Sequence, residues 1–240
     1  MVTSIPSGDI RVFTPKEAAV SSIIDPLSTL INDAYTYGHI KNRQLLPESL
    51  KRLEKSHQLI DEIGPNGFVS VMYSRTADDP SSEPEIIATA SAKPYSHDPS
   101  SQIHCNDTNL LFKRKYKAEQ NAAETDRKAD LRQFGTPEEA TAAYELIAMA
   151  VKPSMQRQGI ASQLLDACID EIIRRAKEVD ESQGVRSGKI DLLISTLQEM
   201  SEGFYAKKGW RTTNTKTFKP GVSGSVEGFH IVDMVRRLEY

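Results

Sequence analysis

The pattern of apolar and polar positions divides the chain into short strands and amphipathic helices. Segments of strand length, most of them apolar and bounded by turn-forming residues, recur along the chain. They cover residues 10–13, 68–73, 85–92, 144–151, 189–195, 211–218 and 229–238. Helical spacing of apolar residues predicts helices around residues 26–35, 47–63, 160–176 and 199–208. The predicted order is therefore a strand, two helices, three strands, a helix, a strand, a helix and two strands.

The junction between the strand at 144–151 and the helix that follows carries the most specific motif. Residues 151–161 read Val-Lys-Pro-Ser-Met-Gln-Arg-Gln-Gly-Ile-Ala. The first N–H groups of a helix have no partner within the helix, and its dipole favours an anion at this end. Gly159 allows a ligand to approach the backbone closely. The junction is therefore typical of a phosphate-binding turn, although an ordinary strand–turn–helix connection is the alternative.

Two motifs resemble those of the GNAT superfamily of acyl-CoA N-acyltransferases. Gln156-x-x-Gly159-x-Ala161 is similar to the Q/R-x-x-G-x-G/A loop with which that family binds pyrophosphate. Residues 203–210, ending in Gly209-Trp210, resemble the aromatic-x-x-x-G-[FW] helix end of the same family. The resemblance spans residues 11–238. It implies the GNAT fold, an α/β (α+β) fold with helices on a central mixed, mostly antiparallel seven-stranded sheet whose parallel fourth and fifth strands splay apart.

The resemblance also implies a binding mode for acetyl-CoA. In the family the pantetheine arm binds backbone groups of the fourth strand, as an added strand would. The corresponding residues here are Met149, Ala150 and Val151. The pyrophosphate would be surrounded by Gln156, Arg157, Gln158, Gly159, Ile160, Ala161 and Ser162. The backbone N–H of Met149 would stabilise the oxyanion.

Two side chains are candidates for proton transfer. Glu145 is the only ionisable side chain in an otherwise apolar strand, and its distance from Gly159 matches the base of the histone-acetylating branch of the family. Tyr205 stands where many relatives place a tyrosine that protonates the departing sulfur. A solvent-facing glutamate at a strand end and a tyrosine that only packs in the core are the alternatives. Gln198 replaces an asparagine that family members often carry seven residues before the tyrosine.

The chain departs from the family between its third and fourth strands. Relatives usually join them by a short hairpin, whereas a polar and charged insert of about 96–141 intervenes here. A loop of this length is usually functional or disordered. We expect the insert to lie over or beside the acceptor cleft, with an oligomer contact as the alternative. His97, His104 and Cys105 lack a fourth ligand at a usual zinc spacing, so we expect no metal site.

Composition narrows the class of protein. A length of 240 residues favours a single domain, 1–240, with the insert as an elaboration. The net charge of −3 predicts no nucleic-acid partner. No apolar run approaches the roughly 20 residues that a membrane helix needs. With only two cysteines and no visible secretory leader, we expect a reducing, intracellular setting, the cytoplasm or alternatively the nucleus.

The sequence thus predicts an acetyl-CoA-dependent N-acetyltransferase. Its acceptor is expected to be a primary amine of a small or amino-acid-like molecule, because no segment suggests a peptide-docking module. Acetylation of a protein lysine or N-terminus is a second enzymatic alternative. A non-catalytic acyl-CoA-binding regulatory protein is a third, and a homodimer is left open.

Overall fold

The computed structural model describes residues 9–74, 84–95, 142–184 and 188–240. Their strands form one seven-stranded mixed sheet in the order β1-β2-β3-β4-β5-β7-β6, with β4 and β5 parallel and helices flanking the sheet. The predicted fold class is confirmed. The insert at about 96–141 lies outside the described residues. Its expected position over or beside the acceptor cleft therefore stays a prediction. No helix among the described residues has the length and apolarity that a membrane crossing requires.

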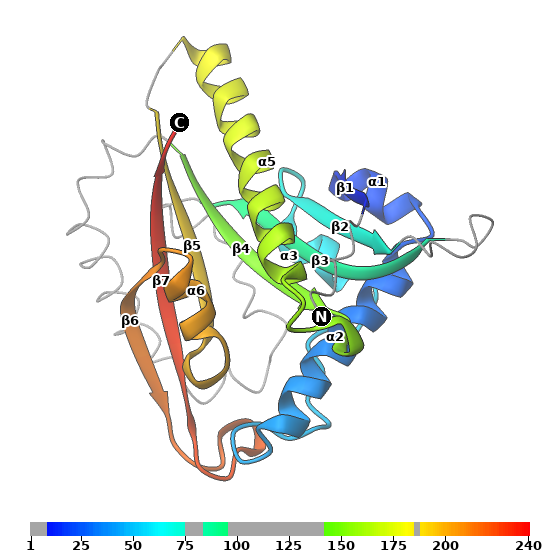
Figure 1. Ribbon diagram of the computed structural model, residues 1–240, viewed down its shortest axis with the longest axis vertical. Coiled ribbons are helices and arrows are strands. Elements are labelled where there is room, and N and C mark those ends of the chain that lie inside the picture. The colour runs from blue at the N-terminus through cyan, green and yellow to red at the C-terminus, as the bar shows by residue number, and fades with distance from the viewer. Residues whose placement is uncertain (1–8, 75–83, 96–141, 185–187) are drawn as a thin grey trace, which may run out of the picture. The chain divides into compact units, whose positions relative to one another are not determined.

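Apart from the additional helix α1, the elements follow the predicted order (Figure 1). The strands are β1 (Asp9–Phe13), β2 (Phe68–Ser74), β3 (Glu85–Pro94), β4 (Ala142–Val151), β5 (Lys189–Leu197), β6 (Arg211–Phe218) and β7 (Phe229–Glu239). The α-helices are α1 (Pro15–Val20), α2 (Ile24–Lys41), α3 (Gln58–Ile63), α5 (Ile160–Gln183) and α6 (Gly203–Lys207). Shorter turns are η2 (Pro153–Met155), the π-helical η3 (Gln198–Glu202) and η4 (Val222–Gly224). All seven predicted strands are present, with small shifts at their ends.

Two compact units share the chain. The first unit comprises Met1–Gly38, Lys51–Lys93 and Leu146–Ile172. The second unit comprises His39–Leu50, Pro94–Glu145 and Ile173–Tyr240. The division passes through β4 and α5, so neither unit is a separate stretch of sequence. The single domain expected from the sequence stays a prediction.

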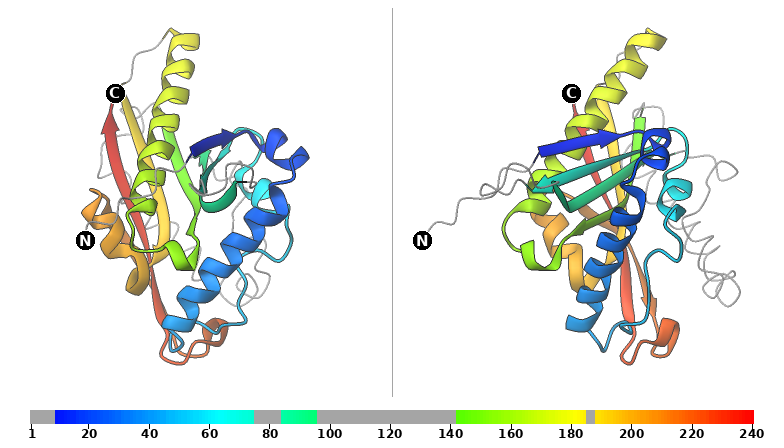
Figure 2. Two further views of the ribbon diagram at one scale, coloured as in Figure 1. Left: turned by 45° about the vertical axis from the view of Figure 1, so that its right-hand side comes forward. Right: turned by 90° about the vertical axis from the view of Figure 1, so that its right-hand side faces the viewer.

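The first unit is built on antiparallel β1, β2 and β3, which lie side by side in Figure 2. Every residue of β2 except Ser74 is buried, which explains its nearly continuous apolar sequence. The core of the first unit is made of side chains from α2, α3, the loop that precedes α3 and the strands. The buried members are Leu27, Ile31, Leu53, Leu59, Ile63, Val69, Val71, Tyr73, Ala148 and Ala150.

The short helix α1 was not predicted, although the sequence carries its signal. The Thr14 side chain accepts a hydrogen bond from the Glu17 backbone, and Glu17 accepts one in return from the Thr14 backbone N–H. Pro15 occupies the first turn, where a missing N–H costs nothing. This capping box starts a helix of six residues, too short for apolar periodicity to reveal.

The predicted helix at 47–63 is wrong in its first two thirds. Only α3 is helical, because side chains from elsewhere satisfy the backbone before it. Asn32 on α2 accepts hydrogen bonds from the N–H groups of Arg52 and Leu53 and donates to the Leu53 carbonyl. The Gln58 side chain accepts from the Glu54 N–H. These contacts replace the helical hydrogen bonds, and Asn32 lies 21 residues from Leu53 in the sequence.

The second unit is built on antiparallel β5, β7 and β6 (Figure 2). Lys189 pairs with Glu239 at one end of the β5–β7 ladder, and Leu197 pairs with Ile231 at the other. A smaller apolar cluster lies at that second end, where Phe218 and Phe229 stack with ring centroids 4.8 Å apart. Its other members are Leu45, Leu46, Leu50, Leu197, Met200, Val222 and Ile231.

The long helix α5 confirms the predicted periodicity. Its buried residues are Ile160, Leu164, Leu165, Cys168, Ile169, Ile172, Ala176 and Asp180. They recur every three or four positions, as one face of a helix requires. Asp180 is the polar exception, and its carboxylate accepts a hydrogen bond of 2.8 Å from the Tyr240 hydroxyl.

A buried ion pair in the first unit yields a stability prediction. Arg52 binds Glu62 through two hydrogen bonds of 2.9 and 2.5 Å, and the Glu62 side chain is only 2% exposed. Gln58 donates a further bond of 2.9 Å to Glu62. We expect Glu62→Ala to lower the free energy of unfolding by about 3 kcal/mol, because Arg52 and Gln58 would lose a shared anionic acceptor. Denaturant unfolding followed by circular dichroism measures this loss.

Glu48→Ala is the matched control. Glu48 also pairs with an arginine, Arg43, at 2.9 Å, but both side chains are exposed. Its removal should change the free energy of unfolding by less than about 1 kcal/mol. Equal effects of the two substitutions would show that the buried pair adds nothing to stability.

His39 in the second unit predicts how stability depends on pH. Its side chain is buried, and desolvation lowers its pKa below the ordinary value, while hydrogen bonds to the backbone of Leu50 and Pro47 act in the opposite direction. The unfolded chain therefore binds the proton more readily than the folded chain. Stability should be complete above about pH 6.5 and decrease as the pH falls through and below that value.

The test compares the wild type with His39→Gln by thermal unfolding between pH 5 and 8. As the pH falls, the Tm of the wild type should decrease more than the Tm of His39→Gln. His57→Gln serves as the control, because the His57 side chain is 67% exposed. A constant difference between wild type and His39→Gln would contradict the prediction.

Candidate functional site

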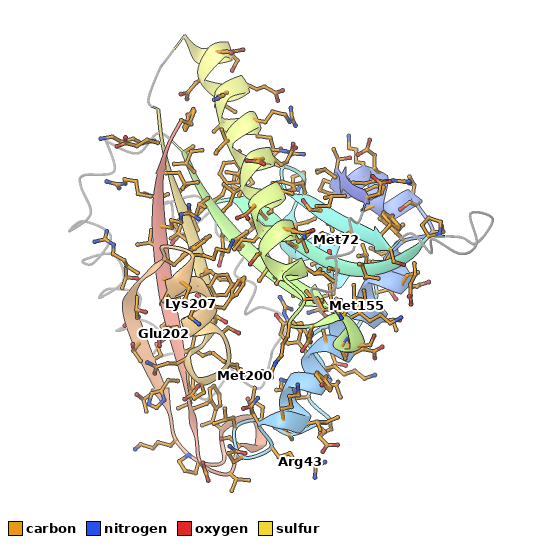
Figure 3. The ribbon with its side chains drawn as sticks, in the orientation of Figure 1. Arg43, Met72, Met155, Met200, Glu202 and Lys207 are labelled. Carbon is orange, nitrogen blue, oxygen red and sulfur yellow. The ribbon has the colours of Figure 1, made fainter. Side chains whose placement is uncertain are left out.

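The turn between β4 and α5 has an unusual backbone. The Met155 N–H donates to the Lys152 carbonyl at 2.8 Å and closes η2 directly after the strand. Arg157 and Gly159 then both take positive φ angles, of 65° and 82°. Left-handed residues interrupting a turn point successive N–H groups toward one side, a geometry known to bind anions. Met155 marks this turn in Figure 3.

The same turn leaves a run of backbone donors unused. The N–H groups of Ser162 and Gln163 donate to the Gly159 carbonyl. Within the described residues, no backbone acceptor is found for the N–H groups of residues 157–161. Residues 157–159 are also exposed to solvent. Five consecutive donors at the start of a 24-residue helix favour binding of a phosphate or pyrophosphate.

The end of β4 is oriented by hydrogen bonds on both of its edges. The Lys152 N–H donates to the Ile87 carbonyl on β3 at 2.8 Å. Adjacent residues of a strand point their backbone groups to opposite edges, so Val151 faces away from β3. Its carbonyl accepts a hydrogen bond of 3.2 Å from the Gln156 side-chain amide. The Gln156 side chain therefore links the turn to the strand. The donors that face outward from the turn are then backbone N–H groups and not this side chain.

The side chains around the turn contribute limited positive charge. Lys152 is paired with Glu85. The Gln158 amide donates to the Ser154 carbonyl at 3.4 Å. Arg157 is exposed, and no ion pair joins it to another described residue. An anion at the turn would therefore meet backbone N–H groups and one arginine.

The ten residues predicted to bind the coenzyme all belong to the first unit, as one continuous segment of strand, turn and helix. The two predicted proton-transfer residues belong to the second unit. Glu145 is half-buried on β4, where Ala143, Leu146 and Ala148 are buried. Neither the coenzyme assignment nor the catalytic assignment is tested by this placement, and both stay predictions.

Tyr205 is buried at 4% exposure on α6. Its ring makes edge contacts with Phe204 and Trp210, with centroids 5.1 and 5.6 Å away. Its carbonyl accepts the N–H groups of Lys208 and Trp210, which end the helix at Gly209. The ring therefore packs in the core, as the structural alternative requires.

Sequence reasoning missed a buried carboxylate on β7. Asp233 is 3% exposed and receives hydrogen bonds from Ser195 on β5 and from Asn214 on β6. Lys216 lies 3.1 Å from the same carboxylate. Asp233 is the only acidic residue in the largely apolar run 229–235. The reasoning that selected Glu145 in its strand could therefore have selected Asp233 as well. Its three partners lie on other strands, so the sequence could not predict them.

A second missed feature joins Glu199 on η3 with His230 on β7. The His230 Nδ1 lies 2.7 Å from the Glu199 carboxylate. The two residues are 31 positions apart, and neither stands in a motif, so no local signal could have paired them.

Comparisons with known proteins agree with the motifs. A family model described as "Acetyltransferase (GNAT) domain" matches residues 122–212, which include the turn before α5, Glu145 and Tyr205. The resemblance drawn from the sequence is confirmed. A search of curated proteins finds no match to this chain.

Solved structures share the fold at low sequence identity. The polyamine N-acetyltransferase of Drosophila melanogaster is 13% identical, with a TM-score of 0.52 over 96% of this chain and 100% of its own. NAA60 of Arabidopsis thaliana in complex with acetyl-CoA is 14% identical, with a TM-score of 0.50 over 96% and 98%. The ribosomal-protein alanine N-acetyltransferase of Escherichia coli is 11% identical, with a TM-score of 0.50 over 97% and 96%. These similarities establish the fold.

The turn predicts the effect of a substitution at Gly159. A valine at φ 82° would be strained, and its branched side chain would occupy the space in front of the N–H groups. We expect Gly159→Val to reduce affinity for coenzyme A at least tenfold, measured by isothermal titration calorimetry.

Gly184→Val is the matched control at the other end of α5. Gly184 has a φ of 66°, and no atom lies within 4 Å of an added Cβ. The Gly184→Val substitution imposes a similar backbone penalty at a position away from the turn. The affinity of this variant for coenzyme A should therefore equal that of the wild type. Unchanged affinity in a folded Gly159→Val protein would disprove the assignment of the turn.

Proposed function

Because the chain carries a GNAT acetyltransferase domain, we propose that it transfers the acetyl group of acetyl-CoA to a primary amine of a small or amino-acid-like molecule. The observation that carries the proposal is the run of unused N–H donors at residues 157–161. A pyrophosphate is the anion of coenzyme A that such a run would bind. The solved structures with the same fold include an enzyme described as forming N-acetylagmatine and one in complex with acetyl-CoA.

The coenzyme would lie along the segment from Met149 to Ser162. The pantetheine arm would add to the edge of β4 that faces away from β3, where Val151 points. Met149 lies two residues earlier in the strand, and its N–H would stabilise the oxyanion that forms on the acetyl carbonyl. The residues from Gln156 to Ser162 would hold the pyrophosphate.

The main chemical obstacle is the protonation of the amine. An amine with a pKa near 10.4 is neutral in only about one molecule in 2,500 at pH 7. Deprotonation therefore costs roughly 4.6 kcal/mol, which makes a general base valuable. Glu145 would accept this proton. The thiol is a better leaving group, since its pKa is near 8.5, so the Tyr205 hydroxyl would contribute less.

The acceptor class needs a direct experiment. Release of free coenzyme A should be followed with a polyamine, free amino acids, a lysine-containing peptide and a peptide with a free N-terminus. Preference for the small amines supports the proposal. Preference for a peptide would favour the protein-acetylating alternative, and tight coenzyme binding without any amine-dependent thiol release would favour a regulatory protein.

We also propose a cytoplasmic location, acetyl-CoA as a co-substrate without a metal, and a small-molecule amine as the acceptor, with no nucleic-acid or membrane partner. Cys168 is buried on α5, and a chain with only two cysteines suits a reducing compartment. A homodimer stays an open alternative that light scattering would decide.

The two proton-transfer candidates predict effects of different size. Glu145→Gln keeps the shape of the side chain and removes the base, so kcat should fall by about 10²–10⁴ with coenzyme affinity intact. The loss should become smaller as the pH rises toward the pKa of the amine, because solvent then supplies the neutral form. Tyr205→Phe should cost about tenfold, because the leaving group is already tolerable and the ring packing is preserved.

Both variants should be measured from pH 6.5 to 9.5 with one saturating amine. Glu239→Gln, which changes an exposed carboxylate at the end of β7, should leave kcat unchanged. A larger defect in Tyr205→Phe, or a pH-independent defect in Glu145→Gln, would show that the base lies elsewhere.

A further inference from the structure

The Gln156 side chain binds a carbonyl that the proposed coenzyme would need. Its Nε2 donates to the Val151 carbonyl at 3.2 Å. The Lys152 N–H donates to Ile87 on β3, so the Val151 carbonyl, at the other end of the same peptide unit, points to the opposite edge of β4. That edge is the one to which the pantetheine arm would add, with Val151 among its backbone partners. Gln156 thus stands where an amide of the arm would bind.

The contact has a structural reason in the unbound protein. Val151 is buried, with 8% of its surface exposed. A buried carbonyl without a donor is costly, and Val151 receives one from Gln156. The pantetheine arm carries amide N–H groups, which are donors of the same kind as the side-chain amide of glutamine. The side chain and the arm are therefore chemically equivalent partners for this carbonyl.

The turn does not depend on this contact for its shape. The Met155 N–H closes η2 on the Lys152 carbonyl at 2.8 Å, and the Gln163 N–H donates to the Gly159 carbonyl where α5 begins. Gln156 is half-buried, and no second hydrogen bond joins its side chain to a residue in the described part of the chain. The amide can therefore leave the Val151 carbonyl without a change in the backbone.

The released amide would lie next to the predicted pyrophosphate site. Gln156 directly precedes the unused N–H groups of residues 157–161, and Val151, Gln156 and these donors all belong to the first unit. A hydrogen bond to a charged phosphate oxygen is roughly twice as strong as one to a neutral carbonyl. A pyrophosphate at the turn therefore favours transfer of the amide from Val151 to the phosphate.

We propose that Gln156 exchanges its partner when the coenzyme binds. In the unbound protein its amide holds the Val151 carbonyl. In the complex it yields that carbonyl to an amide of the pantetheine arm and donates to the pyrophosphate instead. This rests on the proposed function, in which coenzyme A lies along the segment from Met149 to Ser162. The exchange breaks and forms hydrogen bonds only.

The exchange couples the two halves of the coenzyme. The arm displaces the amide from Val151, and the pyrophosphate attracts the same amide, so both act on one hydrogen bond. Whichever half binds first breaks this bond, and the second half binds without that cost. Each half should therefore raise the affinity for the other by the same factor, about fivefold, which corresponds to the net contribution of one neutral hydrogen bond.

A fixed brace is the alternative role of Gln156. A carbonyl oxygen has two lone pairs, so Val151 could accept hydrogen bonds from Gln156 and from the arm together. The side chain would then stay in place and hold the turn in its binding conformation. Removal of a brace weakens binding of both halves of the coenzyme, whereas removal of an exchanging amide strengthens binding of the arm. The two roles thus differ in the sign of one measurement.

The experiment measures the affinity of the full chain for S-acetylpantetheine, inorganic pyrophosphate and coenzyme A, by calorimetry and by chemical-shift titration. Gln156→Met keeps the length of the side chain and removes its donor. We expect the affinity of this variant for S-acetylpantetheine to rise about fivefold and its affinities for pyrophosphate and coenzyme A to fall about tenfold. The coupling between S-acetylpantetheine and pyrophosphate should disappear. Unchanged or lower affinity for S-acetylpantetheine would overturn the proposal.

Gln163→Met is the matched control, since it makes the same substitution on α5 one residue beyond the predicted coenzyme segment. No hydrogen bond joins the Gln163 side chain to another described residue, so all three affinities should equal those of the wild type. Thermal unfolding verifies that both variants are folded.

A spectrum of the wild type tests the exchange without a substitution at the site. The ¹H–¹⁵N signal of the Gln156 side-chain amide is assigned by its absence in Gln156→Met. It should shift when either S-acetylpantetheine or pyrophosphate is added alone. A signal that stays unchanged at saturation with S-acetylpantetheine would show that the amide keeps its partner.

The outcomes separate this proposal from the function on which it rests. A wild-type protein without affinity for coenzyme A would refute the proposed function of the turn. A wild type that binds coenzyme A, together with a Gln156→Met protein that binds both halves more weakly, would refute only the exchange. Gln156 would then be a fixed brace between the turn and β4.

Discussion

The site depends on one constraint, the reversal of the chain between β4 and α5. Arg157 and Gly159 both adopt the left-handed conformation there, and a non-glycine residue in that region costs roughly 1–2 kcal/mol. The apolar face of α5 offsets this cost, since each large buried side chain contributes about 1.5–3 kcal/mol. Ile160 and Leu164, both almost fully buried, fix where the helix must begin. Packing of α5 thus fixes the turn in the conformation in which the N–H groups of residues 157–161 have no backbone acceptor among the described residues.

Polar groups inside the sheet follow a different rule. A carboxylate in an apolar strand must find donors, because burying it without partners is costly. Asp233 obtains them from β5 and β6, on either side of its own strand. Glu62, on helix α3 outside the sheet, obtains them from Arg52 and Gln58. Such clusters make the identity of neighbouring strands and loops specific, since a shift of register would leave the carboxylate unpaired.

Most elements could be predicted because their signals are local. The period of apolar residues identified the strands and α5, and Gly209 correctly marked the end of the helix that carries Tyr205. Errors arose where distant side chains act on the backbone. Asn32 holds residues 52–53 out of a helix, and the capping box of α1 starts a helix too short to show a period. The π-helical form of η3 had no signal in the pattern.

By itself, the sequence determined the order of elements, the turn before α5 and the acetyltransferase motifs, because each depends on residues within a few positions of one another. Only the tertiary structure decided that Gln156 turns back to the Val151 carbonyl and that Asp233 is neutralised by Lys216. It also decided that Glu199 orients His230. These pairs are set by the register of strands and by where a helix lands, which depend on the packing of the whole unit. Local composition cannot encode a contact whose two halves lie 31 residues apart.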